Sequence, residues 1–493
     1  MKLSKLTIAL MLIAALIIGA GGMYVGMTGF QTASAPVPSQ NTKQPPQQQQ
    51  KKDASQHASD VSFASVKKAY SVISNSFYKN VDQDKLLNGA IRGMVESLGD
   101  RFSVYMDPKT AKQFTQSLAS SYDGIGAEVT MVNGKVTIMS PFKGSPADKA
   151  GLRANDQIVS INGKSIADLN LYEAVQKIRG KKGTTVKLGV KRPGAPDVMK
   201  IKVTRGDIPI RTVYPDTVQK NGHLFGIIQI SSFSRGTADD FKKALQDLED
   251  KGIDGLVIDV RGNPGGYLGA VTKIGDLLIP KDEPIVQVED RNGNIKRYFS
   301  SLKQKKDYPI VGLINGGSAS AAEILSAALH EAGGYPLVGT TSFGKGTVQT
   351  EYDIGGGQLK LTIAKWLTPD GNWINKKGIK PSVKVQQPDY FHAHPITVKK
   401  GKPLTYNENN DKVKNAQIIL KGLGFDPGRE DGYFSKQTKD AVKAFQEIND
   451  LRTTGKINTK TASTLDKKIL KAVKLKKNDA QLQQALTLLE KHQ

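Results

Sequence analysis

Three glycine-rich segments in the second half of the chain contain residue types that suit attack on a carbonyl group. They are Val257–Gly266, Asn315–Ile324 and Ser342–Gln349. In the second segment an apolar strand pattern ends in a Gly-Gly turn, and Ser320 then precedes a helical pattern. Ser320 is therefore expected at a helix N-terminus, where free N–H groups and the positive end of the helix dipole stabilise an oxyanion formed when a serine attacks a carbonyl.

Ser320 also has a purely structural interpretation, because Ser320-x-x-Glu323 fits a capping box. A nucleophilic serine needs a base as well. His330 lies ten residues along the same predicted helix, and at 1.5 Å per residue that is about 15 Å, too far to contact Ser320. Three further histidines lie in no recognisable motif: His223, His392 and His394. The chain has no cysteine, so thiolate catalysis and cysteine-ligated metal sites are excluded.

Lys345 is the better candidate for the base. It lies on a glycine-flanked turn after another predicted strand, and adjacent strand ends would bring it beside Ser320. A lysine acts as a base only if burial lowers its pKa from about 10.4 toward neutrality, because the ammonium has no lone pair. Gln349 would orient the amine without adding charge. In a straight strand Gln349 lies about 13 Å from Lys345 at 3.3 Å per residue, so the segment must bend or the side chains must converge.

The same turn supports a different class of site. Residues Gly339–Lys345 spell most of a phosphate-binding P-loop after a short apolar strand. Gly346 stands where that motif requires Ser or Thr, and Val348–Ile354 alternates as a strand where a helix should follow. Nucleotide binding is therefore disfavoured.

An α/β core would bring these loops together. Residues 206–395 alternate short apolar strands with helical patterns. The expected strands are Leu224–Ile230, Gly255–Val260, Pro309–Ile314 and Pro336–Val338. The expected helices are Ala238–Leu248, Leu268–Leu278 and Ala321–Ala332.

Residues 118–205 differ in pattern, and the segment Gly144–Gly163 resembles a PDZ domain through Gly151-Leu152, Asp156 and Ile158–Gly163. The resemblance implies a carboxylate-binding loop that receives a peptide C-terminus on its backbone N–H groups while the peptide adds a strand. This loop would comprise Gly124, Ile125, Gly126 and Ala127. Arg179, at the end of the predicted helix Leu171–Ile178, is a candidate partner for the peptide carboxylate, although a solvated helix-end arginine is the simpler interpretation.

The N-terminus indicates export. Lys2 and Lys5 precede the uncharged, mostly apolar run Leu6–Met27, which suits a signal or a single membrane span. The positive-inside rule keeps the lysines in the cytoplasm, so the following residues should be outside. Ala33–Ala35 resembles a cleavage site, which would give a secreted enzyme, but the length of the run favours a retained anchor in the cell membrane.

The segments that follow the anchor lack a core of their own. Residues 31–60 are rich in Ser, Gln, Pro and Lys and should form a disordered linker. Residues 61–117 have apolar residues at helical spacing, and the exposed apolar faces of these helices favour a homodimer.

The C-terminal region resembles the small three-helix peptidoglycan-binding module over residues 412–470, through Val413–Phe425, Asp431–Ser435 and Thr438–Gln446. Lysines between Lys456 and Lys477 suit anionic wall polymers or lipid surfaces. The net charge of +24 arises mainly from lysines spread along the chain, without an arginine-rich block, so nucleic-acid binding is disfavoured.

The three catalytic segments, in this order, resemble those of the carboxy-terminal processing, or tail-specific, serine proteases, over about residues 61–390. Leu98–Asp100 and Tyr105-Met106 match the family's N-terminal part. The resemblance implies Ser320 as nucleophile, Lys345 as general base and Gln349 as orienting residue. It also implies an oxyanion hole formed by the Ala321 N–H and by one N–H of the Asn263–Gly266 turn, from Gly265 or Gly266; the sequence does not decide between these glycines. Ala322 departs from the family's usual serine at a position that is not the nucleophile.

The expected architecture is therefore multidomain. In order it comprises a membrane anchor (1–30), a disordered linker (31–60), a helical region (61–117), an α+β PDZ domain (118–205), an α/β serine protease core (206–395), a linker (396–411), an all-α peptidoglycan-binding domain (412–470) and a basic C-terminal helix (471–493).

The function implied by the resemblance is that of an exported endopeptidase. Its PDZ domain would bind unstructured protein C-termini, and its core would cleave nearby through an acyl-enzyme on Ser320. No metal or organic cofactor is required. The alternative is a cell-wall adaptor in which the PDZ and wall-binding modules act without catalysis; intact Ser320, Lys345 and Gln349 argue against it.

Overall fold

The computed structural model describes residues 53–117, 120–355, 357–399 and 401–491. It divides into two units, one ending at Gln83 and one that runs from Asp84 to the C-terminus. The first unit contains α2 (Asp53–Ser76). The expected anchor at residues 1–30 and most of the expected linker lie outside the described residues. No helix within the described ranges is both long and apolar enough to cross a membrane.

The second unit begins with the remainder of the helical region. It contains α3 (Gln83–Glu96), the short strand β1 (Val104–Met106) and α4 (Pro108–Ser117). Sequence patterns do not predict β1, which pairs antiparallel with β18 (Gly357–Leu367), Tyr105 lying opposite Leu359. The region before the PDZ domain is therefore joined to the core by a strand as well as by its helices.

The PDZ domain is confirmed. Its sheet has the order β3-β4-β5-β7-β8, with β6 added to β5. The strands are β3 (Ala127–Val132), β4 (Lys135–Pro141), β5 (Gln157–Ile161), β6 (Lys164–Ser165), β7 (Thr185–Lys191) and β8 (Met199–Thr204). Helices α5 (Pro146–Lys149) and α6 (Leu171–Ile178) complete it. Strands β2 (Ser121–Gly124) and β9 (Gly206–Pro209) pair where the chain enters and leaves the domain.

The α/β core is built on a sheet of order β10-β11-β12-β15-β16-β19, parallel except for the edge strand β10. Its strands are β10 (Val213–Lys220), β11 (His223–Ile230), β12 (Gly255–Asp259), β15 (Ile310–Ile314), β16 (Leu337–Gly339) and β19 (Val383–Lys384). On one face pack α7 (Thr237–Glu249), α8 (Leu268–Leu278) and α9 (Ala321–Ala327), the last continuing into a π-helical turn, Ala328–Ala332. Because parallel strands share their carboxyl edge, the loops after β12, β15 and β16 lie at the same edge of the sheet.

A second sheet lies beyond this edge. It has the order β1-β18-β13-β14, and β17 also pairs with β18. The strands of the core in it are β13 (Pro284–Asp290), β14 (Ile295–Phe299), β17 (Thr347–Ile354) and β18 (Gly357–Leu367). We call residues 342–346, which contain Lys345, the lysine turn. β17 begins directly after this turn, so the second sheet fixes one end of it.

The C-terminal helical module contains α10 (Asp411–Gly422), α11 (Lys436–Ile448) and α12 (Thr459–Val473). Single 3-10 turns at Asp389–His392 and Lys476–Asn478 flank it. The buried amides of Gln417 and Gln446 hydrogen-bond the loops between the helices. The module thus has a core of its own.

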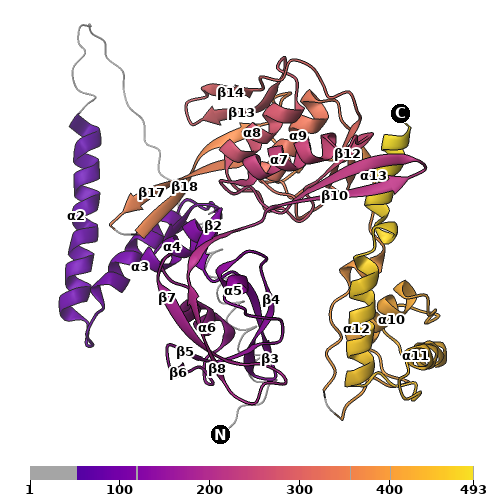
Figure 1. Cartoon of the computed structure of the whole chain (residues 1–493). Coiled ribbons are helices and arrows are strands. Elements are labelled where there is room, and N and C mark those ends of the chain that lie inside the picture. Colours follow the sequence, from indigo (N-terminus) through magenta and orange to yellow (C-terminus); the bar gives the residue numbers. More distant parts are fainter. Residues whose placement is uncertain (1–52, 118–119, 356, 400, 492–493) are drawn as a thin grey trace, which may run out of the picture. The chain divides into compact units, whose positions relative to one another are not determined.

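The segment expected as a basic C-terminal helix differs from that description. α12 continues to Val473, and the final helix α13 (Ala480–Glu490) contains no lysine or arginine. Its residues Leu482, Leu486 and Leu489, at helical spacing, pack on the second face of the core sheet against Phe225, Val257 and Leu313. α13 is therefore a layer of the α/β core (Figure 1).

Candidate active site

Ser320 stands immediately before α9, where the sequence predicts it. Its backbone has φ +55° and ψ −115°, a conformation that non-glycine residues rarely adopt and that places the side chain at a sharp strand-to-helix turn. Its N–H donates to the Glu323 carboxylate at 2.8 Å, as the capping-box interpretation expects. Ser320 thus combines the capping bond with a backbone conformation that a cap alone does not require.

The loops after β12 and β15 are bonded to each other around Ser320. The Asn315 side chain accepts N–H groups from Gly262 and Gly317 at 2.9 and 3.0 Å. The Ser318 hydroxyl donates to the Val260 carbonyl at 2.8 Å, and the Ala319 N–H donates to the Asn263 carbonyl at 2.9 Å.

The loop Asn263–Gly266 passes close to Ser320. A methyl group on Gly265 would lie 2.8 Å from the Ser320 Cβ, so only glycine fits there. The Gly265 N–H donates to the Asn263 side chain at 2.8 Å, so it is already occupied. Within the described residues no hydrogen bond from the N–H groups of Gly266 or Ala321 is present. These two N–H groups therefore suit an oxyanion better than that of Gly265.

Lys345 lies on the turn between β16 and β17, against the same loops. The Phe343 N–H donates to the Ser318 carbonyl at 3.0 Å, and the Lys345 N–H donates to Glu323 at 2.8 Å. Burial, together with repulsion from Lys360, lowers the pKa of the Lys345 amine to about 8, against the attraction of Asp100 and Glu323. Its Nζ lies 4.9 Å from the centre of the Phe102 ring. A pKa of about 8 leaves a minor fraction of the amine neutral near physiological pH, and this fraction can act as a base.

The structure does not join Gln349 to this amine. The Gln349 Nε2 donates to the hydroxyls of Thr347 at 2.9 Å and Thr362 at 3.1 Å. No hydrogen bond between Gln349 and Lys345 occurs in the part of the chain that the structure describes. The pairing of β17 with β18 shifts register between Val348 and Gln349, but this irregularity does not bring the Gln349 amide into a hydrogen bond with Lys345 within the described residues.

The P-loop alternative fails on structural context. A P-loop leads into a helix whose N-terminus holds the phosphates. Here the residues after Lys345 form the strand β17. This segment therefore has the wrong geometry for phosphate binding.

In the predicted carboxylate-binding loop of the PDZ domain, Gly124–Ala127, two backbone carbonyls accept hydrogen bonds from other residues of the same domain. The Ile125 carbonyl accepts the Ala147 N–H at 2.7 Å, and the Gly126 carbonyl accepts the Phe142 N–H at 2.9 Å and the Ser145 hydroxyl at 2.8 Å. Gly126 has φ +74°, which suits glycine.

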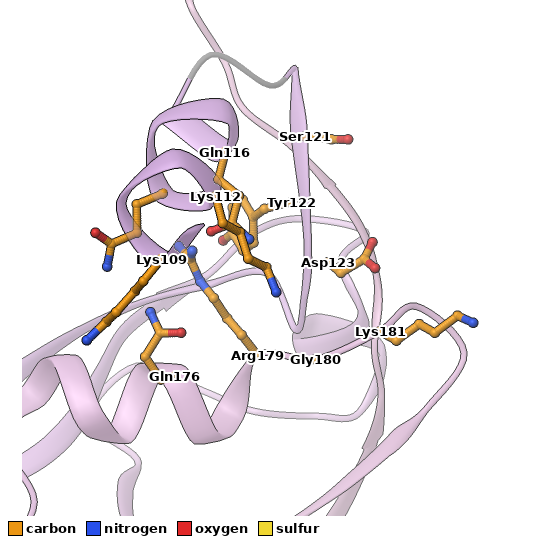
Figure 2. A pocket seen from close by; sticks show the side chains of 11 residues that line it. Lys109, Lys112, Gln116, Ser121, Tyr122, Asp123, Gln176, Arg179, Gly180 and Lys181 are labelled. Carbon is orange, nitrogen blue, oxygen red and sulfur yellow. The ribbon is translucent and has the colours of Figure 1, made fainter. Parts of the chain in front are cut away.

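Arg179 lies at the C-terminal end of α6, with its guanidinium 4.4 Å from the centre of the Tyr122 ring. It lines a cavity of about 600 Å³ between α4, β2 and the end of α6. Figure 2 shows Lys109 and Lys112 on the α4 side of this cavity and Lys181 beyond Arg179. With Asp123 as its one carboxylate, the lining is strongly basic.

Comparison with known proteins identifies the family. Models match residues 224–385 as peptidase family S41, residues 124–203 as a PDZ domain, residues 409–465 as a putative peptidoglycan-binding domain, and residues 16–110 as the N-terminal domain of the activating protease CtpB. Carboxy-terminal processing protease CtpB of Bacillus subtilis is 52% identical over 480 residues, which cover 96% of this chain and 97% of that protein. The chain belongs to the carboxy-terminal processing proteases of peptidase family S41.

Other relatives agree with this family. Carboxy-terminal processing protease CtpA of B. subtilis is 44% identical over 88% of this chain and 91% of its own. A probable CtpA-like serine protease of Staphylococcus aureus is 35% identical over 86% of this chain and 84% of its own. This S41 protease is thus a serine-type peptidase with PDZ and peptidoglycan-binding domains, as the sequence predicts.

Sequence reasoning did not predict that the loop after α3 in this S41 protease lies beside the Lys345 side chain. Asp100 accepts the Thr362 hydroxyl at 2.5 Å and the Ser103 hydroxyl at 2.6 Å, and Thr362 in turn accepts from Gln349. Together with the ring of Phe102, these contacts place the loop after α3 beside the Lys345 amine. The match at Leu98–Asp100 was the available signal, but it carried no indication of where the loop lies.

Proposed function

We propose that this S41 protease cleaves peptide bonds with Ser320 as nucleophile and Lys345 as general base. The single observation that carries the proposal is the lysine turn, which is bonded to the nucleophile loop and holds a half-buried amine with a pKa of about 8. At neutral pH part of this amine is unprotonated, so it can accept the proton of the Ser320 hydroxyl.

In the proposed reaction the Ser320 Oγ attacks the scissile carbonyl while its proton passes to the Lys345 Nζ. The oxyanion of the tetrahedral intermediate accepts the Ala321 N–H and, by our inference, the Gly266 N–H. Lys345 then gives its proton to the leaving amine, and an acyl-enzyme remains on Ser320. A water activated by the same amine releases the product. For Gln349 to orient Lys345, its amide has to turn away from Thr347 and Thr362.

The substrates in this proposal are unstructured protein C-termini. The loop Gly124–Ala127 precedes β3 and would receive the peptide as an added strand. The basic cavity beside it, with Arg179, supplies charge that complements a terminal carboxylate.

We also propose that the enzyme acts outside the cytoplasm, anchored in the cell membrane by Leu6–Met27, with secretion after signal cleavage as the alternative. The peptidoglycan-binding domain would hold it at the cell wall. A homodimer through α2 is supported by the exposed side chains of Phe63, Phe77 and Tyr78 on that helix and after it.

The test is to incubate the purified protein with an unfolded protein and to identify the products by mass spectrometry. Ser320→Ala and Lys345→Ala are run beside wild type, and a reactive-serine probe is applied to all three. Trimming from the C-terminal side by wild type alone, with probe labelling lost in Ser320→Ala, supports the protease. Equal behaviour of all three proteins would favour the adaptor.

A further inference from the structure

A buried carboxylate connects the two loops of the proposed active site. Glu323, in the first turn of α9, is fully buried. Its Oε2 accepts the Ser320 N–H and the Lys345 N–H, each at 2.8 Å. Its Oε1 accepts the Gly344 N–H and the Ser342 hydroxyl, each at 2.6 Å. One side chain therefore binds the nucleophile turn and three residues of the lysine turn.

The directions of these hydrogen bonds show that Glu323 acts as an acceptor in all four. The Ser342 hydroxyl oxygen accepts the Ile379 N–H at 2.6 Å, so its own proton is directed to Glu323. All four partners of Glu323 are thus donors, which suits an ionised carboxylate, an acceptor only. Within the described residues Glu323 forms no salt bridge with a basic side chain. Four short charge-assisted hydrogen bonds take the place of a counterion.

A helix cap would not need this arrangement. Capping requires a carboxylate bonded to the Ser320 N–H, and a solvent-exposed glutamate at the third helical position can do that. Three of the four bonds instead go to a turn that lies about twenty residues further along the chain. Oε2 is shared between the backbone of the proposed nucleophile and the backbone of the proposed base, so moving either turn breaks a bond on the same atom.

We propose that Glu323 is a positioning residue that fixes the nucleophile turn and the lysine turn in one relative placement. It contacts neither substrate nor the reacting atoms and acts through Ser320 and Lys345, so the inference rests on the roles proposed for those two residues. The strained backbone of Ser320 and the left-handed Gly344, with φ +85°, are both held by its bonds.

The charge of Glu323 also acts on the lysine amine. A nearby carboxylate favours the ammonium, opposing the burial that makes Lys345 a base. Removing this charge without changing the size of the side chain should therefore make the amine easier to deprotonate while loosening the two turns. The first effect increases the neutral fraction of the amine, whereas the second lowers the rate. A general loss of structure would lower the rate without moving the pKa of the amine, so the two explanations can be distinguished.

The test is Glu323→Gln in the full-length protein. Whichever way the amide turns, its NH2 group faces two donors, so at least two of the four bonds are lost. The matched control is Glu331→Gln, which lies on the same helical run and, among the described residues, accepts only the Asp370 N–H at 2.9 Å. We expect kcat of Glu323→Gln to fall by about 100-fold, the size of effect that small misplacements produce. KM should stay within about threefold, since substrate contacts are unchanged.

Two further measurements keep the test decisive. The acid limb of kcat/KM against pH should move to lower pH in Glu323→Gln and not in the control. Ser342→Ala, which removes one donor, should lose about tenfold in kcat and guards against a variant that fails to fold. Activity of Glu323→Gln within threefold of wild type, or a fall with an unmoved acid limb, would overturn the inference. If instead Ser320→Ala retains full activity, the proposed function itself has failed.

Discussion

The pKa of the Lys345 amine should depend on the positive charge of Lys360. Lys360 lies on β18, is half-buried, and its positive charge helps to lower the pKa of Lys345. With that pKa at about 8, about a tenth of the amine is neutral at pH 7 and about nine tenths at pH 9. The value of kcat/KM should therefore rise about tenfold over this range and level off above it.

Replacing Lys360 with Gln removes a like charge and so raises the pKa of Lys345. We expect the acid limb of kcat/KM to move to higher pH by the order of half a unit to one unit. At pH 7 this lowers activity about three- to tenfold, while activity near pH 10 is almost unchanged. The sign is the informative part, because an impaired fold would lower activity at every pH.

The assay is cleavage of an unfolded protein between pH 6 and pH 10, with thermal denaturation at each pH. Lys365→Gln is the matched control, because Lys365 lies on the same strand and pairs with Glu289 at 2.8 Å. Its profile should superimpose on that of wild type. A limb that stays in place in Lys360→Gln, or moves to lower pH, would refute Lys345 as the titrating base.

Three other predictions concern residues other than Lys345 and Lys360. Asp100→Asn should move the acid limb to lower pH, because it removes a carboxylate that favours the charged form of Lys345; the same pH series measures it. Arg179→Ala should raise KM for tails with a free carboxylate but not for amidated tails, which parallel peptide assays compare. Leu486→Ala should lower the unfolding free energy by about 2–5 kcal/mol, because it opens a cavity under α13; denaturant titration measures it, and a loss below 1 kcal/mol would contradict the packing.

Local patterns predicted the parts of the site that depend on local geometry. A strand, a Gly-Gly turn and a helical pattern place Ser320 at a helix N-terminus, and the structure has it there. The alternation of Val348–Ile354 predicted the strand β17 and so disfavoured the P-loop. The choice between Gly265 and Gly266 was open, because it depends on the Asn263 side chain, whose bond to the Gly265 N–H no pattern reveals.

Local sequence patterns do not predict contacts between residues that are far apart in the sequence. Thr362 and Asp100 are 262 residues apart and meet only because β1 pairs with β18. Glu323 fits a capping box from its spacing alone, and nothing in that spacing indicates its bonds to the lysine turn. The role of Gln349 stays a prediction, since its amide bonds Thr347 and Thr362 instead of the amine.

The last helix, α13, belongs to the α/β core, although it follows the peptidoglycan-binding domain in the sequence. Arg261, in the glycine loop after β12, donates to Asp259 at 2.7 Å and to Asp479 at 2.8 Å, and Asp479 caps α13. Because α13 covers one face of the core sheet, the peptidoglycan-binding domain is inserted between β19 and α13 and is not a detachable tail. Removing residues 479–493 would expose apolar side chains of the four core strands β11, β12, β15 and β16 and leave the partly buried Arg261 with one carboxylate fewer. Truncation at the C-terminus should therefore disturb the same loop that presents Gly265 to Ser320, even though the wall-binding domain itself lies before the cut.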